Sequence, residues 1–207
     1  TYIDVIQTLY TGYKDIGPIS IGNYWTFVNL NDVEGWRFKF GLSTSNKFSK
    51  YVLLNAYAAY GLKDQKVKYG GSLLWLIKKS PRQSIGASYK NDVINTSDFD
   101  KFYASGGLLS SIGIRRVEAG GYIPQKIIGV RELKVDYFRE FNMGYSFRVG
   151  YTQRYLQPLG NFVINFYSDS KSLRPNKTLQ SFTSSEFSIF HRFSWQEKFV
   201  SGEFDRL

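Results

Sequence analysis

The single histidine, His191, is the side chain through which this sequence could most readily perform acid–base catalysis. A Ser–His–Asp arrangement would need its imidazole as the base. His191 alternates with Ile189 and Phe193, so in an extended strand it shares their apolar face. We therefore expect a packed or interfacial histidine, and no catalytic residues. Cysteine is absent, which excludes thiolate zinc sites, and no compact Asp-rich loop suggests a metal site, so we expect neither a metal nor a cofactor.

Basic residues at alternate positions are the second group of side chains that could take part in binding or chemistry. They lie on the polar parity of their predicted strands: Arg37, Lys39, Lys68, Lys90, Arg148, Arg154 and Arg192. The chain has 27 Lys and Arg against 17 Asp and Glu, a formal net charge of +10. One interpretation is a cationic interior that favours anions or docks an acidic segment. The other, which we favour, is an internal salt-bridge network with Glu132, Asp136 and Glu186. Because the basic residues are dispersed, we do not expect nucleic-acid binding.

The strand predicted over residues 34–43 shows what must position these side chains. Trp36, Phe38 and Phe40 fall on one parity, and Arg37 and Lys39 fall on the other. Successive side chains of a strand point to opposite faces, so one face is aromatic and the other is cationic. A charge facing lipid costs about 2–4 kcal/mol at the bilayer midplane. The pattern thus predicts lipid on the aromatic side and water on the basic side.

The same alternation recurs along the chain and predicts eight to ten strands joined mainly by short turns. Strands are expected over 34–43, 51–62, 67–77, 84–91, 126–138, 144–155, 161–168 and 181–195, with weaker ones near 2–9 and 18–29. Residues 92–125 interrupt the rhythm, and we interpret them as a long loop or lid with a weakly helical middle at 107–118. No run of about 18 apolar residues occurs, so a transmembrane helix is excluded.

Aromatic residues form the complementary set, which we expect to face lipid or to form interfacial girdles. This set comprises Trp36, Phe38, Phe40, Tyr60, Trp75, Tyr145, Phe147, Tyr151, Phe193 and Trp195. The fold expected is an all-β, antiparallel up-and-down transmembrane β-barrel, complete or partial, with residues 1–207 as one barrel segment. The alternative is a soluble basic β-domain in which these aromatics fill a sandwich core.

Several segments resemble an uncharacterised family of Bacteroidota outer-membrane β-barrel proteins. These segments are Glu34-Gly-Trp-Arg-Phe-Lys-Phe-Gly, Asn46-Lys-Phe-Ser-Lys, Ala59-Tyr-Gly-Leu-Lys-Asp, Lys66-Val-Lys-Tyr-Gly, Pro81-Arg82, Ser88-Tyr-Lys-Asn-Asp, Pro158-Leu-Gly and Glu197-Lys-Phe-Val-Ser-Gly-Glu-Phe-Asp-Arg206. The family places a carboxypeptidase-regulatory-like sandwich before a C-terminal barrel that is distantly similar to surface-antigen barrels of outer-membrane assembly. We expect neither a signal peptide nor that domain within residues 1–207, and residues 93–125 fit the family poorly. The resemblance implies part of a barrel and supplies no catalytic residues.

The function expected from these observations is that of a non-enzymatic bacterial outer-membrane protein. We expect a scaffold or accessory subunit of an envelope assembly, export or transport complex. Its partners would be outer-membrane lipid and other outer-membrane or periplasmic proteins. A pore for anionic solutes through a basic lumen is the alternative within the same fold.

Overall fold

The computed structural model is all-β in the part of the chain that it describes. It describes residues 13–22, 27–45, 47–95, 127–141, 144–160, 163–166 and 177–195. The strands are β1 (Tyr13–Ile16), β2 (Ile19–Gly22), β3 (Val28–Asn31), β4 (Gly35–Thr44), β5 (Val52–Gly61), β6 (Val67–Lys79), β7 (Arg82–Asn95), β8 (Ile127–Glu140), β9 (Tyr145–Pro158), β10 (Ile164–Phe166), β11 (Lys177–Leu179) and β12 (Phe182–Phe193).

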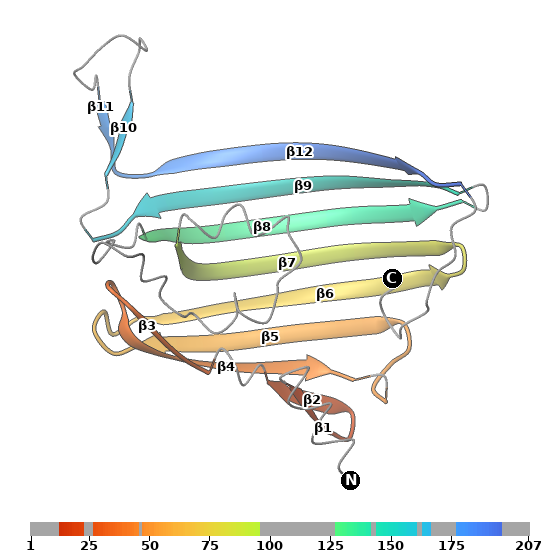
Figure 1. Ribbon diagram of the computed structural model, residues 1–207, viewed down its shortest axis with the longest axis horizontal. Helices are drawn as coiled ribbons and strands as arrows, with labels where there is room; N and C mark the ends of the chain where they lie inside the picture. The colour runs from red at the N-terminus through yellow and green to blue at the C-terminus, as the bar shows by residue number, and fades with distance from the viewer. Residues whose placement is uncertain are drawn as a thin grey trace.

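Ten strands form one antiparallel sheet in the order β1-β2-β4-β5-β6-β7-β8-β9-β12, with β3 paired to β4. Strands β4 to β9 follow one another as an up-and-down meander, seen side by side in Figure 1. A separate two-stranded hairpin, β10–β11, projects from the end of the sheet where β12 begins. The predicted antiparallel all-β architecture is confirmed. The described sheet is not closed, because β1 and β12 lie at its two ends, and its form is that of an open sheet.

The register divides the sheet into two faces with opposite chemistry. The polar face carries the row Lys90, Glu132 and Arg154, which are direct partners across β7, β8 and β9. The apolar face carries the row Leu73, Ala87, Val135, Tyr151 and Phe187 across β6 to β12. Because each strand alternates, every row next to one of these belongs to the other face.

Burial is the reverse of that in an ordinary soluble domain. Among the described residues, the buried hydrophobic side chains are Ala59, Leu76, Ile127, Ile128, Val130 and Leu156. The buried polar or charged ones are Ser20, Glu34, Arg37, Lys68, Ser84, Asp92, Glu132, Ser146 and Thr152. Meanwhile Trp36, Phe38 and Phe40 are 53%, 41% and 48% exposed. Soluble domains bury their large apolar residues, so the core of this sheet is mainly polar.

Several strand boundaries differ from the sequence-based expectation. Strand β7 continues to Asn95, four residues into the segment 92–125 that the sequence assigns to a loop. Its last residues pair with β8 from Val130 to Ile127, and this pairing overrides the turn propensity of Asn91-Asp92. The remainder of that segment, including the helical middle at 107–118, lies outside the described residues, as does the strand expected near 2–9. The weak strand near 18–29 corresponds to β2 and the start of β3, and only Ile164–Phe166 is described as strand within 161–168.

No helix in the described part of the chain has the length and apolar character to cross a membrane.

Candidate functional site

The hairpin between β3 and β4 places the Glu34 carboxylate on the polar face, at one end of the sheet. The Asn31 side-chain oxygen accepts hydrogen bonds from the backbone N–H groups of Val33, at 3.1 Å, and Glu34, at 2.7 Å. Gly35 then adopts a left-handed φ of +66°, a conformation that suits glycine. This local turn fixes Glu34 with its side chain completely buried.

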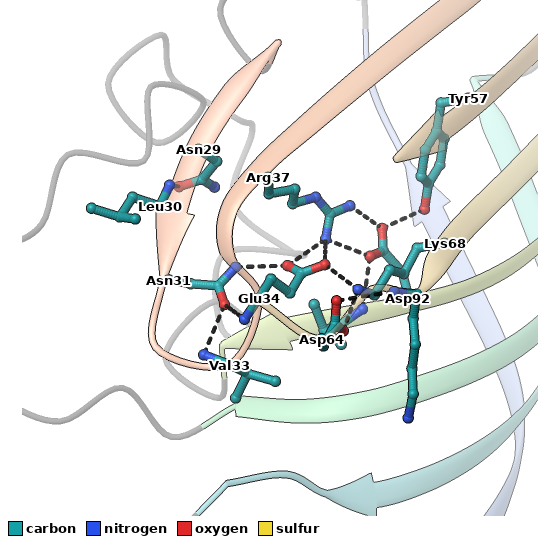
Figure 2. Close-up of polar contacts among 12 residues, drawn as sticks. Asn29, Leu30, Asn31, Val33, Glu34, Arg37, Tyr57, Asp64, Lys68 and Asp92 are labelled. Atoms are coloured by element: carbon teal, nitrogen blue, oxygen red, sulfur yellow. Dashed lines mark hydrogen bonds and ion pairs between the residues drawn. The ribbon is translucent and has the colours of Figure 1, made fainter. Parts of the chain in front are cut away.

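Glu34 is the centre of a network of buried charges, which we call the hairpin cluster: Glu34, Arg37, Tyr57, Asp64, Lys68 and Asp92. Figure 2 shows these side chains pointing toward one another. The Glu34 carboxylate lies 3.0 Å from the Arg37 guanidinium and 2.7 Å from Lys68 Nζ. It also accepts a 2.6 Å hydrogen bond from the Asn31 side-chain amide. Lys68 forms a second ion pair with Asp64 in the β5–β6 turn.

Asp92 connects the hairpin cluster to the far side of the sheet. Its carboxylate lies 2.7 Å from the Arg37 guanidinium and accepts a 2.7 Å hydrogen bond from the Tyr57 hydroxyl. Arg37 belongs to β4 and Asp92 to β7, with β5 and β6 between them in the sheet. Direct contact between these side chains requires the sheet to curve so that its polar face is concave.

Glycines on the polar face leave room for side chains to lie flat across it. A Cβ added to Gly70 would lie 2.6 Å from the Tyr57 ring. A Cβ added to Gly61 would lie 2.5 Å from the Asp64 carboxylate and 2.8 Å from Glu34. Close approach of this kind is a common reason for glycine within a strand. The hairpin cluster therefore depends on glycine at these two positions as well as on its charged side chains.

A second network crosses the other half of the polar face. Glu132 lies 3.0 Å from Lys90 Nζ and 2.5 Å from Arg154, and Arg154 reaches Glu186 at 2.8 Å. These residues come from β7, β8, β9 and β12, so the network links strands up to the edge of the sheet. Two of the partners expected from the sequence, Glu132 and Glu186, thus do form salt bridges. The third, Asp136, lies 4.0 Å from the exposed Arg148.

All of the basic residues singled out in the sequence lie on the polar face. Arg37 and Lys68 belong to the hairpin cluster, and Lys90 and Arg154 belong to the second network. The others are more peripheral: Lys39 has its Nζ 4.1 Å from the centre of the Tyr57 ring, and Arg148 and Arg192 are exposed.

Sequence reasoning did not identify Glu34, Tyr57, Asp64 or Asp92 as members of a site. A signal for Asp92 was present, since Ser88, Lys90 and Asp92 continue one polar parity. Because the sequence assigns residue 92 to a loop, Asp92 was not counted as a polar-face residue of the strand.

The aromatic residues singled out in the sequence lie on the opposite, apolar face within their strands. Trp36, Phe38, Phe40, Tyr60, Trp75, Tyr151 and Phe193 are exposed there, and Tyr145 and Phe147 are partly buried. Trp195 follows the end of β12 and is 80% exposed. No described element covers this face, in contrast to the sandwich core that a soluble β-domain would require.

His191 lies on the apolar face. Its Nδ1 is 2.6 Å from the Tyr145 hydroxyl, and the two rings stack with centroids 5.9 Å apart. This contact is an aromatic pair at the surface of β9 and β12. Within the described ranges, no group of three or more His, Cys, Asp or Glu side chains has the geometry of a metal site.

Comparisons with known proteins found no match: no protein-family model, no curated protein and no solved structure matches the chain.

Proposed function

We propose that this chain forms part of a transmembrane β-barrel in a bacterial outer membrane and acts there without enzymatic activity. The observation that carries the proposal is the reversed burial, with charged side chains packed on the concave face and aromatics exposed on the convex one. Only a barrel or a helix satisfies its backbone hydrogen bonds within lipid. An antiparallel sheet with an apolar outer face is suited to forming a barrel.

The apolar face has the height that a bilayer requires. On β8 the outward residues Leu133, Val135 and Tyr137 lie between two cations, Arg131 and Arg139. The eight-residue separation corresponds to about 27 Å along a strand. At a tilt of about 40° this is about 21 Å along the barrel axis, close to the apolar band of about 25 Å that outer-membrane barrels present. The two arginines would then lie at opposite membrane boundaries.

The pairing of charges supports a structural role. Arg37, Lys68, Lys90 and Arg154 all form ion pairs with carboxylates, so much of the positive charge of the interior is neutralised within the protein. A rigid, internally cross-linked wall suits a scaffold or accessory subunit of an envelope assembly, export or transport complex. The resemblance to the Bacteroidota barrel family supports the same location.

Cysteine scanning of β9 and β12 provides the test, because the chain contains no cysteine of its own. Single cysteines at Val149 and Tyr151 are expected to carry spin labels that collide with oxygen dissolved in lipid. Labels at Arg148, and at Ser188 on the paired strand β12, are exposed on the polar face and should instead collide with a water-soluble nickel chelate. Similar accessibility at all four positions in vesicles would contradict the proposal. A protein that remains monodisperse without detergent would instead support the soluble β-domain.

A pore for anionic solutes is a second candidate, favoured by two exposed arginines of the polar face. Arg148 has a side chain 56% exposed, and Arg192 on β12 is also exposed. Anion-selective conductance in planar bilayers that weakens in Arg148→Gln would support the pore. A sealed bilayer, together with stable co-purification of other outer-membrane proteins, would support the scaffold.

A further inference from the structure

One cross-strand row of the apolar face differs from its neighbours because it carries cations. The register joins Lys78, Gln83, Arg139, Phe147 and His191 across β6, β7, β8, β9 and β12. The next row toward the middle of the sheet is apolar: Trp75, Ile85, Tyr137, Val149 and Ile189. The cationic row therefore marks the limit of the apolar surface at this end of the sheet, which we call the basic rim.

A β-bulge brings Lys78 into this row. The β6–β7 register shifts between Leu76 and Lys78, so Lys78 pairs with Gln83 on the apolar face. Simple alternation from Trp75 would have placed Lys78 on the polar face. Bulges re-aim side chains in this way, and here the result is a lysine in the same row as Arg139.

The side chains of the basic rim are presented outward beside aromatic rings. Lys78 and Arg139 are exposed. The Arg139 guanidinium lies 5.0 Å from the centre of the Phe141 ring, which stacks on Phe147 with centroids 6.0 Å apart. Gln83 donates a 2.8 Å hydrogen bond to the Tyr137 hydroxyl, which fixes its amide in the row. Tyrosine rings such as that of Tyr137 are enriched at the level of lipid headgroups.

The turns at the same end of the sheet add further positive charge. Lys47 and Lys50 in the β4–β5 turn and Lys79 at the end of β6 are exposed, and these turns lie at one end of the strands in Figure 1. Glu140 at this end is engaged by the backbone N–H of Arg82 at 2.8 Å.

At the opposite end, Lys68 forms an ion pair with Asp64, and the Lys63 ammonium donates to the Asp32 carbonyl at 2.6 Å. Basic and acidic residues are mixed among the described residues there, whereas the row of the basic rim contains no acidic residue.

We propose that the basic rim binds the phosphate groups of anionic membrane lipids. This inference rests on the proposed function, since only a membrane-embedded barrel would place the row at headgroup level. Arg139 offers the planar donor pair that suits phosphate oxygens, and Lys78 acts as a compact point charge. The adjacent apolar row would contact the acyl chains of the same lipids.

The experiment measures the association of spin-labelled phosphatidylglycerol and of spin-labelled phosphatidylcholine with the protein in neutral vesicles, each as a lipid in direct contact with the barrel. Each basic residue near an anionic headgroup strengthens association about fivefold. Lys78→Gln combined with Arg139→Gln should therefore lower the preference for phosphatidylglycerol about 25-fold. The matched control combines Arg148→Gln with Arg192→Gln, which removes two positive charges at the same end of the sheet but from the polar face. It should leave the preference unchanged.

Two further variants and one further ligand make the outcome decisive. The charge-conserving pair Lys78→Arg and Arg139→Lys should retain the preference, which separates loss of charge from loss of folding. Inorganic phosphate should not displace the lipid, since the proposed ligand is a membrane phosphate. An unaltered preference in the neutralised variant, or an equal loss in the control with Arg148→Gln and Arg192→Gln, would overturn the inference while leaving the barrel intact. Failure of the unaltered protein to insert into vesicles would refute the proposed function and this inference with it.

Discussion

Neutralising Arg37 is the most direct test of the polar core. Its side chain is 8% exposed, and its guanidinium lies 3.0 Å from Glu34 and 2.7 Å from Asp92. Arg37→Gln would leave both carboxylates buried without their shared cation, although Lys68 would still contact Glu34 at 2.7 Å. Breaking a buried ion pair by removing one partner costs about 3–5 kcal/mol. We expect a loss of that size in the free energy of unfolding.

Urea unfolding of the refolded protein in lipid vesicles provides the measurement. With an m-value of about 2 kcal/mol per M, the midpoint should fall by about 1.5–2.5 M. The matched control is Arg148→Gln on the same face, whose side chain is 56% exposed and 4.0 Å from Asp136. An exposed pair of this kind contributes about 0–1 kcal/mol.

Adding Asp92→Asn to Arg37→Gln removes one of the two carboxylates that lose their cation. The double variant should therefore lose less stability than the sum of the two single changes. Equal losses for Arg37→Gln and Arg148→Gln, or strict additivity of the pair, would refute a stabilising role for the hairpin cluster.

Two other pairs of substitutions test the two faces separately. Gly70→Ala should lower stability by about 1–3 kcal/mol because its Cβ would lie 2.6 Å from the Tyr57 ring. Gly71→Ala should be tolerated, since its Cβ would meet only a backbone oxygen at 3.4 Å; the same urea titration would show whether the two differ. On the apolar face, Val135→Arg should cost about 2–4 kcal/mol in vesicles because it places a charge near the bilayer midplane. Thr183→Arg, in the row of Arg131 and therefore near a boundary, should cost about 0–1 kcal/mol; equal stability of these two arginine variants would indicate that the face meets water.

Much of the sheet could be predicted from the period of the sequence. Residues 34–43 and 144–155 alternate without interruption, and they form β4 and β9 with the expected faces. Alternation is a local property, so it identifies a strand and its faces before any partner is known. The strand boundaries were less accurate where polar residues continue a strand. Asp92 resembles a turn residue in isolation, and its place in β7 depends on Arg37 and Tyr57 from other strands.

The composition of the site depended on information that one sequence does not contain. Arg37 and Asp92 are 55 residues apart, and their contact results from the curvature of the sheet across β5 and β6. Curvature follows from register, bulges and glycine positions acting together. The adjacent-strand network was easier to predict, because Glu132 and Arg154 lie on consecutive strands with the same parity. Pairs between neighbouring strands were therefore accessible to sequence reasoning, whereas pairs across the concave face were not.

The open edge of β12 is the feature that most constrains the membrane-inserted form. Strand β12 has 12 residues and pairs with β9 along its full length, while β1 at the other end of the sheet has four. An unpaired backbone group in hydrocarbon costs several kcal/mol, so a long edge cannot remain open there. The described part of β1 is too short to cover it, and we expect β12 to pair with a longer strand once inserted. In an antiparallel edge strand, alternate N–H groups point away from the only neighbour. Hydrogen exchange should therefore protect successive amides of β12 equally in vesicles if the edge is paired; alternating fast and slow exchange would show that it is open and would contradict insertion of this strand into lipid.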